Sequence, residues 1–325
     1  MVEGLGANVI GLNCGLGPKQ MLALLPQLRA ACSLPIAVSA NAGLPVVVEG
    51  QTCYLVEPED FAADCRALLE AGAAIVGGCC GTTPEHISAM VRACRGCTVV
   101  PPPAHRHTLA ASYTHTAELG RAPLIIGERL NPTGKKALKE ALRRNDMDYL
   151  CREALAQADA GAQILDLNVG LPEIDEPDML CVQAVQAVCD LPLQLDTSDP
   201  VALERALRIY NGRPLINSVN GGAESMAAVF PLAKKYGAAV VALTLDEGGI
   251  PSTAAGRIAI AEKMLATAKT YGLSEQDLIV DALAMTVSTG PDNAAVALET
   301  LDYVRHRLGM QTVLGVSNIS FGLPR

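Results

Sequence analysis

The chain has 325 residues, of which 50% are hydrophobic and 3% aromatic, and its formal net charge is 25 − 34 = −9. This composition excludes wholesale disorder, and the few aromatic residues and the negative charge argue against a nucleic-acid partner. No apolar run approaches the roughly 20 residues of a membrane helix, and no basic signal-peptide segment follows Met1. We therefore expect a cytoplasmic α/β enzyme with no membrane partner.

Eleven cysteines are many for a chain of this length. Cytosolic thiols stay reduced and an odd count disfavours complete pairing, so we do not expect a disulfide framework. Metal ligands and small buried apolar side chains are the two remaining interpretations of these cysteines.

Short apolar runs, turns and amphipathic helices alternate through the first third of the chain, which predicts βα units around a parallel sheet. From residue 96 this alternation stops in a segment with three consecutive prolines and three histidines. We interpret residues 97–123 as a linker between a first domain, 1–96, and a second domain, 124–325. The predicted strands of the first domain are 8–13, 35–39 and 73–77, and its predicted helices are 19–31, 58–71 and 84–93.

The alternation resumes after the linker and predicts seven more strands of βα type. A TIM barrel has eight such strands, and the three strands of the first domain are too few to close a barrel. The sequence therefore predicts two partial TIM-type barrels, one represented by its end and the other lacking its last strand. The predicted strands of the second domain are 124–127, 163–167, 193–195, 214–216, 239–243, 278–280 and 312–315.

Polar side chains follow these strands one after another. Any single Asp or Asn in a βα loop could be a helix N-cap. Their recurrence after seven strands favours a polar ligand pocket, because the chemistry of a TIM barrel lies at the carboxyl ends of its strands. The residues concerned are Glu128 to Asn131, Asp166, Asn168, Asp196, Asn217, Asp246, Asp281 and Asn318.

Three cysteines follow strands of the first domain: Cys14 after the first strand, and Cys79 and Cys80 after the third. Three converging thiolates with one open position form a zinc site of catalytic type, in which a substrate thiol loses its proton more easily. Spacing alone still leaves buried structural cysteines as the stronger interpretation. Cys94-x-x-Cys97 is a rival metal or redox pair that lacks a second pair.

The motifs around these cysteines resemble a known family. Gly11-Leu-Asn-Cys14, Ser39-Ala-Asn-Ala-Gly-Leu-Pro45 and Gly77-Gly-Cys-Cys-Gly-Thr-Thr-Pro84 resemble the last three βα units of the homocysteine-binding barrel of cobalamin-dependent methionine synthases. The resemblance implies that Cys14, Cys79 and Cys80 are zinc ligands.

The second domain resembles the pterin-binding barrel of the same family, which is similar to dihydropteroate synthase. The family's Asp-Gly-rich first strand, the barrel strands that follow it and the cobalamin-binding Asp-x-His-x-x-Gly pattern do not occur in the sequence. The resemblance therefore implies an internal piece of a methionine synthase, or a subunit that needs the rest in trans. The matching motifs are Gly127-Glu-Arg-Leu-Asn131, Leu165-Asp-Leu-Asn-Val-Gly170, Asp196-Thr197, Asn217-Ser-Val-Asn-Gly221 and Gly315-Val-Ser-Asn-Ile-Ser320.

The resemblance implies methyl transfer from 5-methyltetrahydrofolate via cobalamin to homocysteine, giving methionine and tetrahydrofolate. The cobalamin would come from another domain or chain. Catalytic roles fall on Asn318, near the leaving nitrogen, and on Asp281. The implied folate-binding residues are Asp196, Asn217, Asp281, Asn318, Asp166, Asn168, Asn131, Thr133 and Gly134.

Two alternative functions remain open. One is a condensing enzyme like dihydropteroate synthase, which would use basic residues on the late strands to bind diphosphate, but residues 282–288 and 317–321 carry no charge. The other is a non-catalytic remnant that binds folate or zinc. Turnover with added cobalamin distinguishes a remnant from an enzyme.

Overall fold

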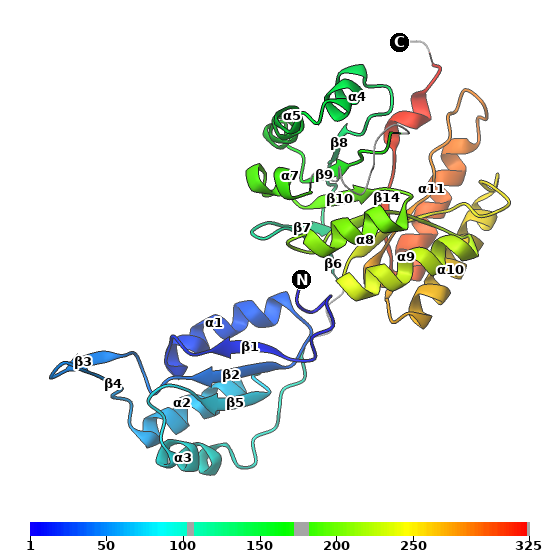
Figure 1. Cartoon of the computed structure of the whole chain (residues 1–325). Coiled ribbons are helices and arrows are strands. Elements are labelled where there is room, and N and C mark those ends of the chain that lie inside the picture. Colours follow the sequence, from blue (N-terminus) through cyan, green and yellow to red (C-terminus); the bar gives the residue numbers. More distant parts are fainter. Residues whose placement is uncertain (103–106, 172–181, 324–325) are drawn as a thin grey trace. The chain divides into compact units, whose positions relative to one another are not determined.

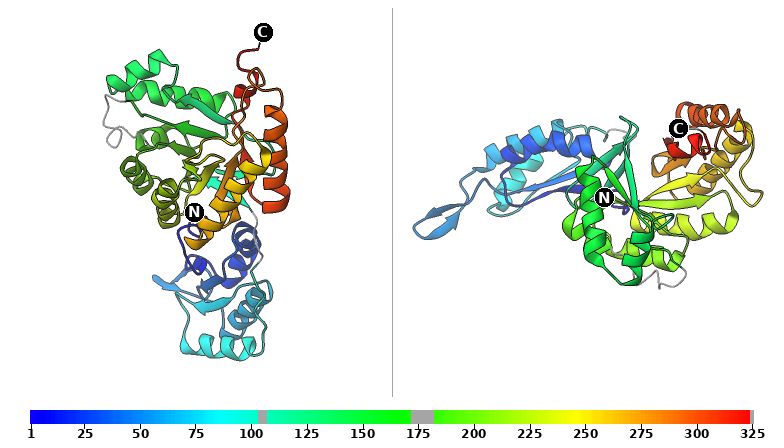
Figure 2. Two further views of the ribbon diagram at one scale, coloured as in Figure 1. Left: turned by 90° about the vertical axis from the view of Figure 1, so that its right-hand side faces the viewer. Right: turned by 90° about the horizontal axis from the view of Figure 1, so that it is seen from above.

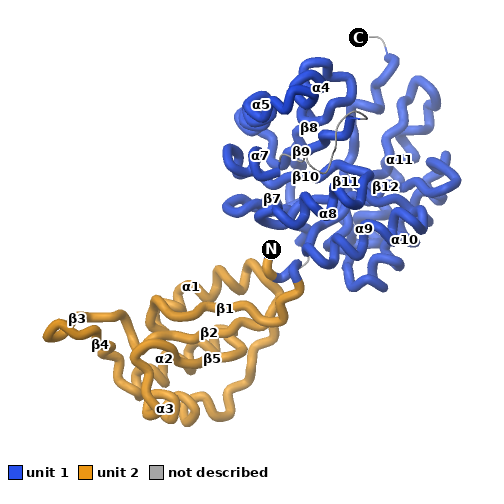
Figure 3. Tube along the Cα trace, viewed as in Figure 1, with its two compact units in different colours: residues 1, 3–5, 106–325 blue, residues 2, 6–105 orange. Residues whose placement is uncertain are grey.

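The computed structural model describes residues 1–102, 107–171 and 182–323 (Figure 1). The chain forms two compact units, which we describe separately (Figure 3). Unit 2 comprises residues 2 and 6–105, and unit 1 comprises residues 1, 3–5 and 106–325. The division falls inside the predicted linker, 97–123, of which residues 103–106 lie outside the described part of the chain.

Unit 2 contains a parallel sheet of three strands in the order β1-β2-β5. A helix follows each strand and begins with proline, a residue whose missing N–H costs no hydrogen bond at that position. The three predicted strands and three predicted helices are confirmed to within two residues. Their bounds are β1 (Ile10–Asn13), α1 (Pro18–Ala31), β2 (Ile36–Ala40), α2 (Pro58–Glu70), β5 (Ile75–Gly78) and α3 (Pro84–Cys94).

A β-hairpin between β2 and α2 was not predicted. It pairs β3 (Val46–Val48) with β4 (Gln51–Cys53) in antiparallel fashion. The two turn residues, Glu49 and Gly50, both have positive φ (50° and 79°), as the tight primed hairpin turns require. Strands of only three residues give too short a pattern for the sequence to reveal them.

Unit 1 contains seven parallel strands that pair strictly in chain order, from β8 to β14. The sheet curls, with helices on its outer side (Figures 1 and 2). This is a partial TIM-barrel arrangement, and the predicted fold class is confirmed. The strands are β8 (Ile126–Leu130), β9 (Ile164–Leu167), β10 (Leu193–Asp196), β11 (Leu215–Asn220), β12 (Ala239–Leu243), β13 (Leu278–Asp281) and β14 (Gln311–Val313).

Apolar side chains of these strands pack against the helices and form the main core, which includes Leu165, Leu193 and Val240. Three of these helices begin with the Asp or Thr caps that βα loops favour, at Asp146, Asp199 and Thr253. The helices are α4 (Lys136–Arg143), α5 (Met147–Asp159), α7 (Val182–Val188), α8 (Pro200–Ile209), α9 (Ala223–Tyr236), α10 (Ala254–Thr270) and α11 (Asn293–Tyr303), with short helical segments η1 (Glu275–Asp277), η2 (Val304–Leu308) and η3 (Val316–Ser320).

A second hairpin, β6 (Thr108–Ala111) and β7 (Thr116–Leu119), lies within the predicted linker. Its alanines, Ala110 and Ala117, form a buried cluster with residues near the start of several barrel strands, such as Ile164 and Leu215. The hairpin thus covers the amino-terminal end of the curled sheet. In the described part of the chain, no helix has the length and apolar character needed to cross a bilayer.

Candidate functional site

The structure brings three thiols of unit 2 together at the carboxyl edge of its sheet. Cys14 follows β1, and its N–H donates to the Ser39 carbonyl at 2.9 Å. The Cys80 Sγ lies 3.6 Å from that of Cys14 and 3.9 Å from that of Cys79, and all three sulfurs lie within 4.8 Å of one another. Tetrahedral zinc with Zn–S bonds of about 2.3 Å spaces its sulfurs by about 3.8 Å. The thiols therefore already have the spacing of zinc ligands.

Hydrogen bonds polarise this thiol cluster. The backbone at Gly15, followed by the Cys80 and Cys79 thiols, lowers the pKa of Cys14. The pKa of Cys79 is raised, chiefly by its hydrogen bond to Cys14. Between Cys14 and Cys79, the Cys14 thiol therefore loses its proton first.

Two residues beside the thiols were not predicted. The Cys80 N–H donates to Oδ1 of the buried Asn41 at 3.1 Å. Tyr54, which follows the unpredicted β3–β4 hairpin, hydrogen-bonds with Cys80, and its pKa is raised by burial first and by that bond second. Its ring also packs on Gly81, where a Cβ would lie 2.3 Å from the Tyr54 Cγ. Only glycine fits at that position.

Of the rival pair, Cys94 is the last residue of α3 and Cys97 lies in the turn that follows. The Cys97 N–H donates to the Cys94 carbonyl at 3.1 Å, and burial raises the pKa of Cys94. Neither residue belongs to the thiol cluster at the sheet edge. A metal or redox role for this pair stays a prediction.

In unit 1, side chains from three neighbouring strands meet at Asp196, the last residue of β10. Its Oδ2 accepts from Asn168 Nδ2 at 2.9 Å and from Asn131 Nδ2 at 3.1 Å. Asn217 on β11 is its direct neighbour in the strand register. The predicted convergence of these residues at the carboxyl end of the sheet is therefore present in the structure.

A second layer lies one step deeper along the same strands. Asp166 is 2% exposed, and its Oδ1 accepts from Gln194 Nε2 at 2.6 Å and from Asn217 Nδ2 at 3.5 Å. Burial, followed by the charge of Asp196, raises the pKa of Asp166 to about 7. Gln194 was not predicted, although its position two residues before Asp196 puts both on one face of the strand.

The loop after β8 also reaches this site. The Thr133 N–H donates to Asn131 Oδ1 at 3.0 Å, which fixes the Asn131 amide, and Gly134 has a positive φ of 73°. Lys135, which was not predicted, donates from Nζ to the carbonyls of Asn131 and Glu128 at 2.9 and 3.0 Å. The lysine thus ties the loop to the end of its strand.

Asp281 ends β13, and its Oδ1 accepts from the Leu283 N–H at 2.7 Å. Burial raises the pKa of Asp281, while the Leu283 hydrogen bond and the Arg257 charge lower it.

Asn318 lies in the exposed η3 segment, and within the described ranges no hydrogen bond joins its side chain to Asp196 or Asp281. Asp246 forms a local turn by accepting from the Gly248 N–H at 2.9 Å, and it does not cap the next helix, whose N-cap is Thr253.

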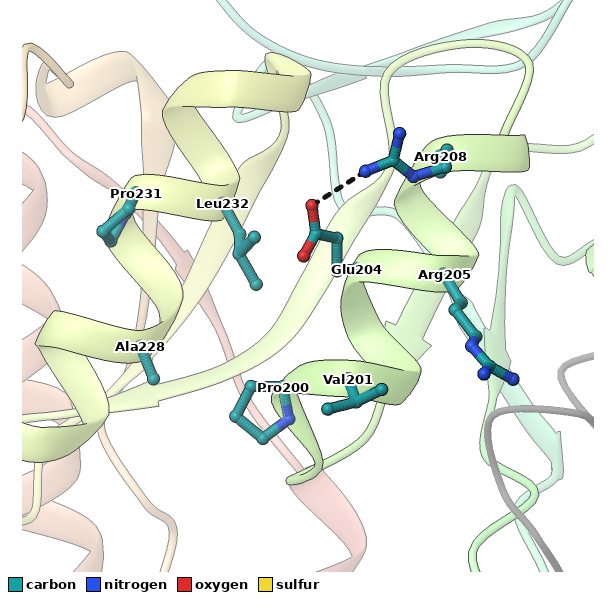
Figure 4. A pocket seen from close by; sticks show the side chains of 8 residues that line it. All are labelled: Pro200, Val201, Glu204, Arg205, Arg208, Ala228, Pro231 and Leu232. Atoms are coloured by element: carbon teal, nitrogen blue, oxygen red, sulfur yellow. Dashed lines mark hydrogen bonds and ion pairs between the residues drawn. The ribbon is translucent and has the colours of Figure 1, made fainter.

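A hollow between α8 and α9 lies on the helical layer, away from the strand ends (Figure 4). Its wall carries an ion pair between Glu204 and Arg208, with an oxygen–nitrogen distance of 3.1 Å. None of the predicted site residues lines this hollow. The candidate chemistry of unit 1 therefore stays with the carboxylates and amides at the strand ends.

Residues 127–324 match the family model of pterin-binding enzymes. The chain belongs to the pterin-binding enzyme family. Residues 1–94 match the model of homocysteine S-methyltransferases. The two matches occur in the order that the sequence motifs predicted.

The curated relatives include methionine synthases, which confirms the predicted resemblance. That of Mycobacterium leprae (strain TN) is 36% identical over 346 residues, covering 99% of this chain and 28% of the relative. That of Mycobacterium tuberculosis (strain ATCC 25618 / H37Rv) is 36% identical over 343 residues, with the same coverage of 99% and 28%. The chain thus spans little more than a quarter of the length of these relatives.

Among solved structures, a dihydropteroate synthase from Xanthomonas albilineans, determined with 4-aminobenzoic acid, has a similar fold. Its TM-score is 0.50 at 17% sequence identity, over 65% of this chain and 77% of that chain. At this identity the likeness concerns the fold alone, and it supports the TIM-type arrangement of unit 1.

Proposed function

We propose that this chain takes part in methyl transfer from 5-methyltetrahydrofolate via cobalamin to homocysteine, as a module of a methionine synthase. The observation that carries the proposal is the Asp196 carboxylate, held by two amide donors from Asn131 and Asn168 at the open end of a pterin-family barrel. A carboxylate has about four lone-pair sites, so it can accept further hydrogen bonds. The N–H and NH₂ edge of a pterin ring offers parallel donors of this kind.

The reaction breaks the bond between the methyl group and a tertiary amine nitrogen, which is a poor leaving group without proton or hydrogen-bond density. We assign that support to Asn318, because an amide can donate or accept as the charge on the nitrogen changes. Asp196, Asn217 and Asp281 hold the ring. Asp166 and Asn168 support these residues by hydrogen bonds to Asn217 and Asp196. The loop with Asn131, Thr133 and Gly134 contacts the ring.

The thiols of unit 2 fit zinc, since their sulfur–sulfur distances of 3.6 and 3.9 Å match tetrahedral thiolate ligands. We propose that Cys14, Cys79 and Cys80 hold a zinc ion. When bound, zinc supplies a Lewis acid that lowers the pKa of the homocysteine thiol. The cobalamin that accepts the methyl group is carried by another domain or chain.

The condensing-enzyme alternative lacks support at the late strands. A diphosphate site needs basic side chains there, and residues 282–291 and 314–323 contain neither lysine nor arginine. A non-catalytic remnant would keep the ring-binding residues without methyl transfer.

Isothermal titration of the full chain with methyltetrahydrofolate tests the binding part of the proposal. We expect measurable affinity, and folded protein that binds no folate would refute the pterin assignment. Turnover with added cob(I)alamin then distinguishes the methyltransferase from a remnant that only binds.

A further inference from the structure

Arg257 on α10 is a buried cation near the end of β13, with 1% of its surface exposed. Its guanidinium donates to three backbone carbonyls: Nε to Pro251 at 3.0 Å, and Nη1 to Ala282 at 2.6 Å and Leu283 at 3.0 Å. Within the described ranges, no ion pair joins it to a carboxylate. Burying an unpaired cation is costly, and the three hydrogen bonds to backbone carbonyls offset part of that cost. We therefore ask what these carbonyls do in the fold.

The carbonyls belong to two loops at the carboxyl end of the sheet. Pro251 precedes α10, and the other two carbonyls directly follow Asp281. Leu283 has a φ of 55°, an uncommon conformation for a branched side chain, and needs external support. Nη1 of Arg257 provides that support by donating to both the Ala282 and Leu283 carbonyls, while Nε holds the Pro251 carbonyl.

The same short segment orients the Asp281 carboxylate. The Leu283 N–H donates to Asp281 Oδ1 at 2.7 Å, so the side chain follows the conformation of the segment. The Asp281 carbonyl accepts from both the Thr244 N–H at 3.1 Å and the Thr244 hydroxyl at 3.0 Å. Thr244 and Arg257 therefore hold three successive carbonyls, from Asp281 to Leu283.

We propose that Arg257 is a positioning residue for the pterin site, which fixes the Ala282–Leu283 backbone and thereby aims the Asp281 carboxylate at the pterin ring. The folate part of this inference rests on the proposed function. The positive charge adds a second effect, because it favours the ionised form of Asp281 against the burial that disfavours it.

The experiment compares Arg257→Met, Arg257→Lys and a control, Arg213→Met, in the full chain. Arg213 is also largely buried, and it pairs with Asp277 at a nitrogen–oxygen distance of 2.5 Å, just before β11 at the other end of the sheet. Its loss destabilises unit 1 without touching the Asp281 segment. Hydrogen exchange of the Leu283 amide and the Asp281 carboxyl pKa, both followed by NMR, report the local effect without any folate.

In Arg257→Met we expect the Leu283 amide to exchange at least about tenfold faster than the loss of global stability explains, and the Asp281 pKa to rise. Methyltetrahydrofolate affinity should fall at least about tenfold. Arg257→Lys keeps the charge, but its shorter side chain with a single nitrogen cannot make the bond to Pro251 and the bonds to Ala282 and Leu283 together, so its Asp281 pKa should stay near that of the wild type while Leu283 still loses protection. Arg213→Met should change neither local signal.

Unchanged Leu283 exchange and an unchanged Asp281 pKa in Arg257→Met would overturn the proposal. Should that variant fail to fold, the Leu283 signal of Arg257→Lys decides in the same way. A wild-type chain that binds no folate would refute the proposed function, whereas the two NMR signals would still decide whether Arg257 positions Asp281.

Discussion

Asp166 and Gln194 are direct neighbours in the register of β9 and β10, and the Gln194 amide donates to the Asp166 carboxylate at 2.6 Å. The pair lies one layer below Asn168 and Asp196, because residues two apart on a strand share a face. The charged neighbours that act on Asp166 are Asp196 and Glu128, both of which disfavour a second negative charge. Asp166 is thus a buried acid that stabilises the folded unit best when protonated.

We predict that this acid makes the stability of unit 1 fall as the pH rises. The pKa of Asp166 is about 7 in the folded chain against an ordinary value of 3.8. Folded protein therefore keeps a proton that unfolded chain releases, and the stabilisation is complete below about pH 4 and lost by about pH 7. At about 1.4 kcal/mol per tenfold change in proton affinity, the loss amounts to about 4 kcal/mol.

Urea denaturation between pH 4 and 8 tests this prediction with Asp166→Asn, which cannot ionise. The free energy of unfolding of the variant, relative to the wild type, should rise between about pH 4 and pH 7 and level off above that. Asp246→Asn is the control, because it removes a carboxylate from a local turn. A difference between Asp166→Asn and wild type that does not change with pH would contradict the raised pKa.

The strand pattern of this chain could be read from the sequence because each strand is a short apolar run bounded by turns and helices. Polar residues at the strand ends, such as Asp196 and Asn168, then met as predicted, because parallel strands bring their carboxyl ends to one edge. The hairpins β3–β4 and β6–β7 were missed. Their strands have only three or four residues, and their pairing partners give no periodic signal.

The sequence also could not separate binding residues from local structural ones. Asp246 and Asp281 each accept a hydrogen bond from the N–H two residues later, so both form the same local turn, and only the burial of Asp281 near Arg257 sets it apart. Arg257 lies in the first turn of helix α10, and nothing in its spacing shows that it bonds to a carbonyl 25 residues away. Tertiary contacts decide such roles.

The zinc proposal predicts about one zinc per chain in purified protein, measured by metal analysis. Cys79→Ser should abolish most of this binding, because hydroxyl replaces one of three thiolate ligands. Cys53→Ser is the matched control, since Cys53 is a partly exposed thiol of the same unit that belongs neither to the cluster nor to the rival pair. Zinc retained at full strength after removal of all three clustered thiols would refute the site.

The pterin proposal predicts that Asp196→Asn weakens methyltetrahydrofolate binding. An amide keeps only one acceptor oxygen where the carboxylate had two. A charged hydrogen bond contributes about 1.5–3 kcal/mol, so affinity should fall about ten- to a hundredfold. In titration calorimetry Asp246→Asn should bind like the wild type, and equal affinity in Asp196→Asn would remove Asp196 from the site.

Asn318→Ala should slow methyl transfer far more than it weakens binding. The nitrogen that we assign to Asn318 changes charge during the reaction, so the hydrogen bond gains strength mainly in the transition state. Removing one such donor lowers the rate about a hundredfold or more. Single-turnover methyl transfer to cob(I)alamin gives the rate and calorimetry gives the affinity. Ser317→Ala, in the same exposed η3 segment, is the control and should leave both unchanged. An Asn318→Ala variant that loses affinity and rate by the same factor would show that Asn318 only binds folate.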